Sequence, residues 1–133
     1  MQKELTLHRA RFVEWAPAAV VAMTACADGS LVALAREDGT VEVLDAAGTW
    51  TCLWTAPGAP HASLTALLWC EFGGSAPRRL FSAGLDGQLH EWDWSTRRAR
   101  CSADSYGGSV WQLSAEPALA ADADSRVRPA PCT

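Results

Sequence analysis

The sequence predicts an all-β fold in which a four-stranded unit is repeated, and two observations lead to this prediction. First, residues 31–45 align without gaps on residues 79–93, so that an Ala, an Asp-Gly pair and a final Asp recur at a spacing of 48. Second, the Asp-Gly pair of each copy lies between two apolar, β-rich runs, which is the strongest short-range signal for a β-hairpin and predicts a type I′ turn with positive φ at its central residues. A period of about 40 to 50 residues is typical of stacked units such as the blades of a β-propeller.

Each copy contains enough chain for four short strands. Apolar segments precede the two hairpins at residues 18–27 and 63–72, and they align at an offset of 44. The change of offset from 44 to 48 predicts a loop insertion at residues 73–78. Residues 49–54 and 98–101 follow the hairpins and are expected to form the fourth strands. Four short strands with turn residues between them form a propeller blade.

The repeats also set the expected limits of the domain. We expect a partial propeller of about two and a half four-stranded blades over residues 5–116, with blade 1 at about 17–55, blade 2 at about 61–102 and the start of blade 3 at about 108–116. Residues 117–133 are rich in Ala, Pro and Asp, and we expect a disordered tail there. Because blades bury both faces against neighbours, we expect a fragment of a longer chain that associates or folds poorly by itself.

Composition excludes several classes of protein. The 133 residues are 49% hydrophobic and carry a net charge of -4, so no overall positive field attracts the chain to nucleic acid or to an anionic membrane. The longest uncharged stretch, residues 15–27, is shorter than the roughly 20 residues that a membrane-spanning helix needs. Glu14 and Pro17 beside this stretch argue against a signal peptide. We therefore expect no contact with a membrane.

Cysteine and arginine residues give no sign of a ligand site. The five cysteines lie far apart without a CxxC pair, which indicates small buried thiols of a reducing compartment rather than zinc ligands or disulfides. Arg97, Arg98 and Arg100 form a basic cluster, for which a solvated outer strand is a better interpretation than an RNA site. We expect no cofactor, no metal and no small-molecule substrate.

The second repeat contains a set of polar residues with a recognisable spacing. His61 follows a Gly-Ala-Pro turn, Ser82 lies in the second strand, Asp86 lies in the hairpin turn, and Trp92 with the next Asp ends the third strand. This set resembles the WD-repeat pattern, which implies a hydrogen-bonded network of the four side chains. Such a network is physically reasonable, because a buried imidazole or indole N–H without a partner costs roughly 1–3 kcal/mol.

The same side chains also have the chemistry of a hydrolase triad. A nucleophilic serine, however, needs an exposed tight turn and a pair of oxyanion donors, whereas Ser82 is expected inside a buried strand. We therefore predict a structural network of His61, Ser82, Asp86 and Trp92 with no catalytic residue, and a propeller-type hydrolase is the alternative from another class.

Four stretches resemble a narrower family. Residues 7–17, 38–43, 79–87 and 106–111 occur in the order found near the N terminus of the cirhin family of WD-repeat proteins. The His-Arg-x-Arg-Phe opening and the Gly-Gly-x-x-Trp entry to the third blade are the more specific of these, because a WD repeat does not require them.

This resemblance implies a non-catalytic scaffold of the nucleus and nucleolus that acts in small-subunit pre-ribosomal RNA processing and in the transcription of that RNA. The implied partners are other proteins of the small-subunit processome, with direct or indirect contact to pre-ribosomal RNA and its guide snoRNP. A WD-repeat adaptor of another complex, such as one in ubiquitin ligation or signalling, is the alternative.

Overall fold

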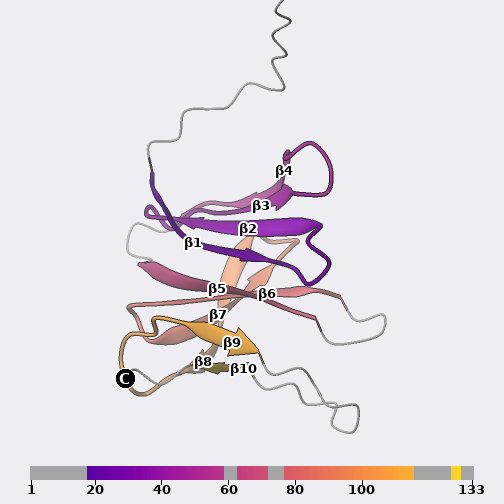
Figure 1. Cartoon of the computed structure of the whole chain (residues 1–133). Helices are drawn as coiled ribbons and strands as arrows, with labels where there is room; N and C mark the ends of the chain where they lie inside the picture. The colour runs from indigo at the N-terminus through magenta and orange to yellow at the C-terminus, as the bar shows by residue number, and fades with distance from the viewer. Residues whose placement is uncertain (1–17, 59–62, 72–76, 116–126, 130–133) are drawn as a thin grey trace, which may run out of the picture.

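The structure is a computed structural model that describes residues 18–58, 63–71, 77–115 and 127–129, and within these ranges it is all-β (Figure 1). Two four-stranded antiparallel sheets account for most of it, each in the order in which the strands follow along the chain. The first sheet consists of β1 (Val20–Ala25), β2 (Leu31–Arg36), β3 (Val41–Asp45) and β4 (Cys52–Ala56). The second consists of β5 (Leu64–Cys70), β6 (Arg79–Gly84), β7 (Gln88–Asp93) and β8 (Arg98–Asp104). We call these sheets blade 1 and blade 2.

Strand register confirms the sequence repeat. Met23 pairs with Leu34 across β1 and β2, while Leu67, 44 residues after Met23, pairs with Ser82, 48 residues after Leu34. Both first strands are also irregular at equivalent positions, between Val20 and Ala22 in β1 and 44 residues later in β5. The two offsets read from the sequence are therefore the two offsets of the paired strands.

Asp-Gly pairs make the expected hairpin turns, but not in the expected geometry. Gly39 has a φ of +82° and Gly87 a φ of +73°, whereas neither preceding aspartate is among the residues with positive φ. A type I′ turn would need positive φ at both residues of the pair. Instead the aspartate accepts a hydrogen bond from the backbone two residues later, as Asp38 Oδ1 does from Thr40 N at 2.9 Å, and only the glycine takes the left-handed conformation.

The two blades stack on one another through apolar faces. β1 lies beside β5, and β5 beside the short strand β9 (Leu113–Ala115), as Figure 1 shows. Because successive side chains of a strand point to opposite faces, Leu80 of β6 packs against blade 1 and Phe81 packs on the far side. The core between the blades contains Cys26, Ala33, Ala35, Val41, Val43 and Ala56 from blade 1 and Leu64, Leu67, Trp69, Leu80 and Trp92 from blade 2.

The C-terminal segment differs from the expectation of disorder. Val127–Pro129 forms a strand, β10, that pairs antiparallel with β9, so the expected disordered tail does not include these three residues. A strand edge has unpaired N–H and C=O groups, and an extended segment of the same chain can satisfy them. The structure does not describe the rest of the expected tail or residues 1–17. Of the insertion expected at 73–78, positions 73–76 also lie outside the described residues.

Cysteine burial was predicted correctly for only part of the set. Cys26 and Cys70 are buried, but Cys52 and Cys101 are exposed because they lie on β4 and β8, the outer strands of the two blades. Cys132 lies outside the described residues. Position in the blade, rather than residue type, therefore decides the burial of these thiols.

The core between the blades yields a first prediction. Leu80 has no exposed surface, so Leu80→Ala removes buried methyl groups and leaves a cavity, which is expected to cost about 2–5 kcal/mol of unfolding free energy. Urea denaturation at fixed protein concentration measures this. The control is Leu53→Ala on β4, where the side chain is 59% exposed and the expected change is within about 0.5 kcal/mol. Equal losses for both variants would contradict the packing described.

Candidate functional site

Ser82 and Trp92 form a buried polar link inside blade 2. The Nε1–H of Trp92 donates to Ser82 Oγ at 2.9 Å, and the serine has no exposed surface. β6 and β7 are neighbouring strands, so the hairpin itself positions the two side chains. The bond satisfies the indole N–H in an apolar core, and it places the serine where solvent does not reach it.

Asp86 pairs with a residue that the sequence did not single out. Asp86 Oδ2 lies 2.9 Å from Nε2 of His90, and Asp86 Oδ1 accepts the backbone N–H of Gln88 at 3.0 Å. Partial burial acts to raise the pKa of Asp86, but the bonds from His90 and Gln88 outweigh it and hold this pKa below its ordinary value. The ionised carboxylate therefore accepts a hydrogen bond from His90.

A cavity of about 480 Å³ lies beside these pairs, and Ser82, Asp86, His90 and Trp92 all line it. Its wall also includes Pro57 and Ser63, which flank residues 59–62. His61, the remaining member of the expected network, lies outside the described residues. The structure thus brings three of the four expected residues to one cavity.

Tryptophans connect the two blades at one end of the sheets. Trp54 of β4 contacts Trp94 edge-on with ring centroids 4.9 Å apart, and Trp54 Nε1 donates to the Trp94 carbonyl at 3.0 Å. Trp94 in turn stacks on Trp69 with centroids 5.5 Å apart. Among the described residues, the buried Nε1 of Trp69 has no hydrogen-bond partner. These rings fill the space between the blades.

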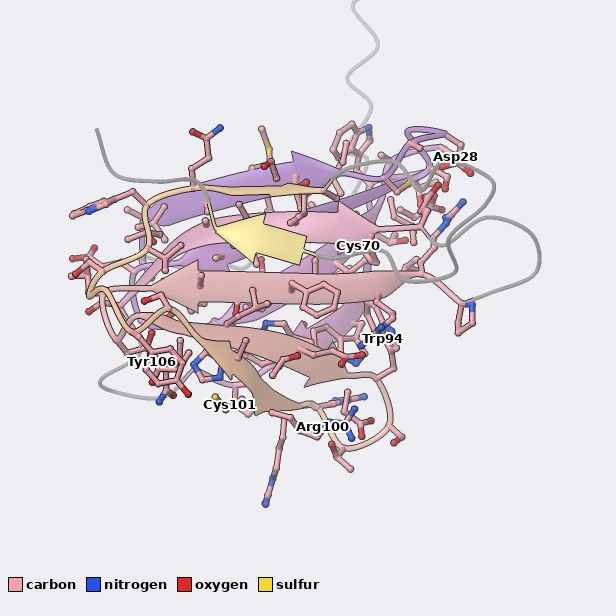
Figure 2. The ribbon with its side chains drawn as sticks, turned by 90° about the horizontal axis from the view of Figure 1, so that it is seen from below. Asp28, Cys70, Trp94, Arg100, Cys101 and Tyr106 are labelled. Atoms are coloured by element: carbon pink, nitrogen blue, oxygen red, sulfur yellow. The ribbon has the colours of Figure 1, made fainter. Side chains whose placement is uncertain are left out.

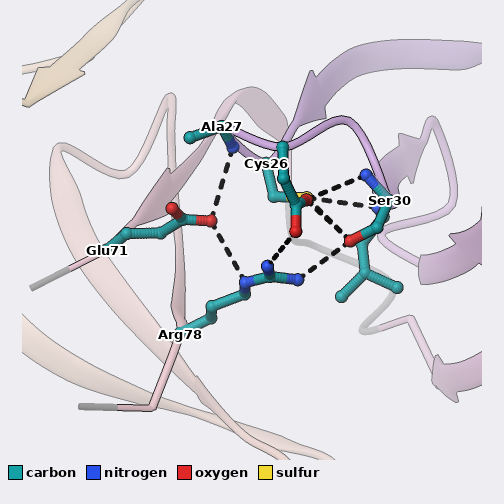
Figure 3. A network of polar contacts seen from close by, with 7 residues as sticks. Cys26, Ala27, Ser30, Glu71 and Arg78 are labelled. Carbon is teal, nitrogen blue, oxygen red and sulfur yellow. Dashed lines mark hydrogen bonds and ion pairs between the residues drawn. The ribbon is translucent and has the colours of Figure 1, made fainter. Parts of the chain in front are cut away.

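An arginine joins the blades at the same end. Arg78, just before β6, forms an ion pair with Asp28 of the β1–β2 turn, donates to Ser30 Oγ at 3.0 Å and lies 3.1 Å from Glu71 Oε1 (Figure 3). Glu71 also accepts the backbone N–H of Ala27 at 3.4 Å. We call Asp28, Ser30, Glu71 and Arg78 the blade clamp. The clamp connects residues that are 48 and 50 positions apart in sequence, so it could not be read from local spacing.

Hydrogen bonds in the clamp hold the carboxyl of Asp28 in its ionised form. The thiol of Cys26, the hydroxyl and backbone N–H of Ser30, and the guanidinium of Arg78 all donate to it. Together they hold the pKa of Asp28 well below its usual range. Protonation of this carboxyl therefore opposes the contact between the blades.

The described residues contain neither a cluster of metal-ligating side chains nor a long apolar helix. No group of three or more His, Cys, Asp or Glu side chains in these ranges is placed to hold a metal ion. None of the described segments is a helix long and apolar enough to cross a membrane. Arg98 and Arg100 lie on β8, where all seven residues are exposed, as expected for a solvated outer strand.

Removal of the Ser82 hydroxyl tests the buried link. Ser82→Ala leaves the Trp92 N–H without a partner and is expected to cost about 1–3 kcal/mol of unfolding free energy. In the double variant with Trp92→Phe, the cost of the serine change should shrink, because both partners of the bond are then absent. Chemical denaturation of the four proteins measures the coupling, and strictly additive losses would contradict it.

The clamp should make the unfolding free energy fall as the pH is lowered. The pKa of Asp28 in the folded chain lies below its ordinary value of 3.8, so its ionised form stabilises the fold above about pH 4, and this contribution is lost as pH falls. The difference in unfolding free energy between the unmodified chain and Asp28→Asn should be present at about pH 6 and shrink toward about pH 2. Denaturation at several pH values measures it, and a constant difference would contradict the clamp.

Comparisons with known proteins relate this arrangement to characterised chains. The chain is 31% identical over 114 residues to the human protein named U3 small nucleolar RNA-associated protein 4 homolog, and 32% identical to its mouse counterpart. It is 25% identical over 118 residues to U3 small nucleolar RNA-associated protein 4 of Schizosaccharomyces pombe. These alignments cover 82–86% of this chain and 16% of each relative. No family model matches the chain.

A solved structure agrees with the blade arrangement. The crystal structure of the RRP9 WD40 repeats superposes with a TM-score of 0.54 at 18% identity, covering 71% of this chain and 27% of that one. At this identity the likeness concerns the fold. With two four-stranded antiparallel sheets stacked face to face and joined by the Trp54–Trp94 and Arg78–Asp28 contacts, the chain is a partial WD-repeat β-propeller similar in sequence to U3 small nucleolar RNA-associated protein 4.

Proposed function

We propose that this chain is part of a non-catalytic WD-repeat scaffold of ribosome biogenesis that acts in small-subunit pre-ribosomal RNA processing. The observation that carries the proposal is the sequence similarity over 82–86% of the chain to U3 small nucleolar RNA-associated protein 4 from human, mouse and fission yeast. The relatives are named for association with the U3 small nucleolar RNA. Membership of the cirhin family, nucleolar location and a role in transcription of the ribosomal RNA belong to the same proposal.

A non-catalytic role is supported by the environment of the polar residues. Ser82 would be the nucleophile of the hydrolase alternative, but it is enclosed in the core and already accepts a hydrogen bond from Trp92. Asp86 is engaged by His90 and by the backbone of Gln88. Each group thus has a structural partner that a nucleophile or base would have to give up.

The four-residue network is proposed as the support of blade 2. Pro57 and Ser63, which lie on either side of His61 in the sequence, line the cavity together with Ser82, Asp86 and Trp92. We infer that His61 completes the network there. Its role is to hold the blade, while partners bind surfaces of the scaffold.

Partners of the chain are proposed to be other proteins of the small-subunit processome, with pre-ribosomal RNA and its guide snoRNP contacted directly or through them. The net charge of -4 favours protein contacts over broad electrostatic binding of RNA. The chain spans 16% of the length of the curated relatives it matches, so the activity of the whole scaffold is part of the proposal.

Co-purification from human cells tests this function. An affinity-tagged chain is expected to recover small-subunit processome proteins together with U3 small nucleolar RNA. Leu80→Asp places a charge in the fully buried core between the blades and serves as the unfolded control, which should recover neither. Recovery of a ubiquitin-ligase or signalling complex in place of processome proteins would overturn the proposal and support the adaptor alternative.

A further inference from the structure

Tyr106 is the most exposed large hydrophobic side chain among the described residues. It is 95% exposed and lies in the connection between β8 and β9, with a φ of +53° that L-residues rarely adopt. Figure 2 shows it at the opposite end of the sheets from Asp28 and Trp94, which belong to the contacts between the blades. The ring therefore takes no part in the packing that holds the two blades together.

Several hydrogen bonds fix the connection that displays this ring. Asp104 Oδ1 accepts the N–H of Tyr106 at 2.8 Å, and Ser105 Oγ donates to the Gly108 carbonyl at 2.9 Å. Ser105 N donates to the Gly87 carbonyl at 2.9 Å, and Ser109 Oγ donates to the Leu85 carbonyl at 3.2 Å. The connection and the β6–β7 turn thus form one rigid unit, and the tyrosine is held in its strained conformation rather than left free.

The β6–β7 turn adds a second exposed apolar residue to this unit. Leu85 is 46% exposed, and at the equivalent position of blade 1, 48 residues earlier, the chain has Glu37. Gly87 in the same turn approaches the Gly108 carbonyl so closely that a Cβ there would lie 2.6 Å from it. Blade 1 has a charged residue at this position, so the hairpin turn itself does not require an apolar one.

Two exposed or partly exposed carboxylates belong to this unit. Asp104 is exposed, the side chain of Asp86 is 50% exposed, and no Lys or Arg occurs in the sequence between Arg100 and Arg126. Acidic groups repel phosphates and attract Lys and Arg side chains. An aromatic ring with carboxylates beside it also favours a guanidinium, which can stack on the ring.

We propose that Tyr106 and Leu85 form a preorganised docking site for an extended protein segment that combines apolar side chains with arginine or lysine. The apolar side chains pack on Tyr106 and Leu85, and the cations face Asp86 and Asp104. Rigid display of a tyrosine lowers the entropic cost of binding, which is a property of interface hot spots. The inference rests on the proposed function, because the segment would belong to a protein that binds the scaffold. Its test uses only the purified chain and a peptide.

A binding experiment with the full chain tests the site. The probe is a short fluorescently labelled peptide in which arginine and leucine alternate, and fluorescence anisotropy measures its affinity. Tyr106→Ala is expected to weaken binding by more than about tenfold, whereas Tyr106→Phe, which keeps the ring, should stay within about twofold. Asp104→Asn keeps the acceptor for the Tyr106 N–H but removes the charge, and it should weaken binding as well.

A matched control comes from blade 1. Trp50 is also an exposed aromatic residue with positive φ, 48% exposed at φ +56°, so Trp50→Ala should leave peptide affinity unchanged. Circular dichroism of each variant verifies that it is folded. Equal binding of a glutamate–leucine peptide or of a short single-stranded RNA, unchanged affinity in Tyr106→Ala, or absence of binding to the arginine–leucine peptide would each overturn the inference. Failure of co-purification with normal peptide binding would count against the proposed function alone.

Discussion

The apolar contact between the two blades is the constraint on which the rest of the structure depends. Neither sheet can bury its inner face alone, and residues of both blades complete one core around Leu80 and Val41. The tryptophan contacts and the clamp of Arg78 lie at one end of this core and fix how the sheets sit on each other. The connection that holds Tyr106 lies at the other end of the sheets, away from these contacts (Figure 2).

Polar groups at the contact serve orientation as much as stability. Arg78 and Asp28 are partly exposed, so their ion pair is screened by solvent and contributes modestly. The buried Ser82–Trp92 bond is more demanding, because loss of either partner leaves an unsatisfied group in the core. Apolar packing thus supplies the driving force, while the Arg78–Asp28 pair orients the two blades and the Ser82–Trp92 bond fixes the geometry inside blade 2.

Periodicity made most of the fold predictable from the sequence. The Asp-Gly pairs located both hairpins, and the offsets of 44 and 48 gave the strand register, because the side-chain alternation of a strand and the repeat both act over short distances. The type I′ geometry was wrong, since a single glycine with positive φ is sufficient when Asp38 or Asp86 accepts a backbone hydrogen bond. β10 was missed because a three-residue strand depends on the edge of β9, which the local sequence does not record.

The candidate site was predictable only in part, because several of its contacts are not recorded in the local sequence. The WD-repeat pattern placed Ser82 and Trp92 in one network, but the Asp86–His90 contact and the Arg78 clamp depend on side-chain directions and on the approach of two repeats. The exposure of Tyr106 likewise depends on a turn and a connection that are distant in sequence and adjacent in space.

Face-to-face stacking of the two blades is the central claim, and nuclear Overhauser effects between tryptophan side chains test it most directly. The account predicts cross-peaks between the indole protons of Trp54 and Trp94, whose ring centroids lie 4.9 Å apart, and between those of Trp94 and Trp69. Cross-peaks within each blade but none between Trp54 and Trp94 would show that the sheets fold without stacking, and would contradict the account.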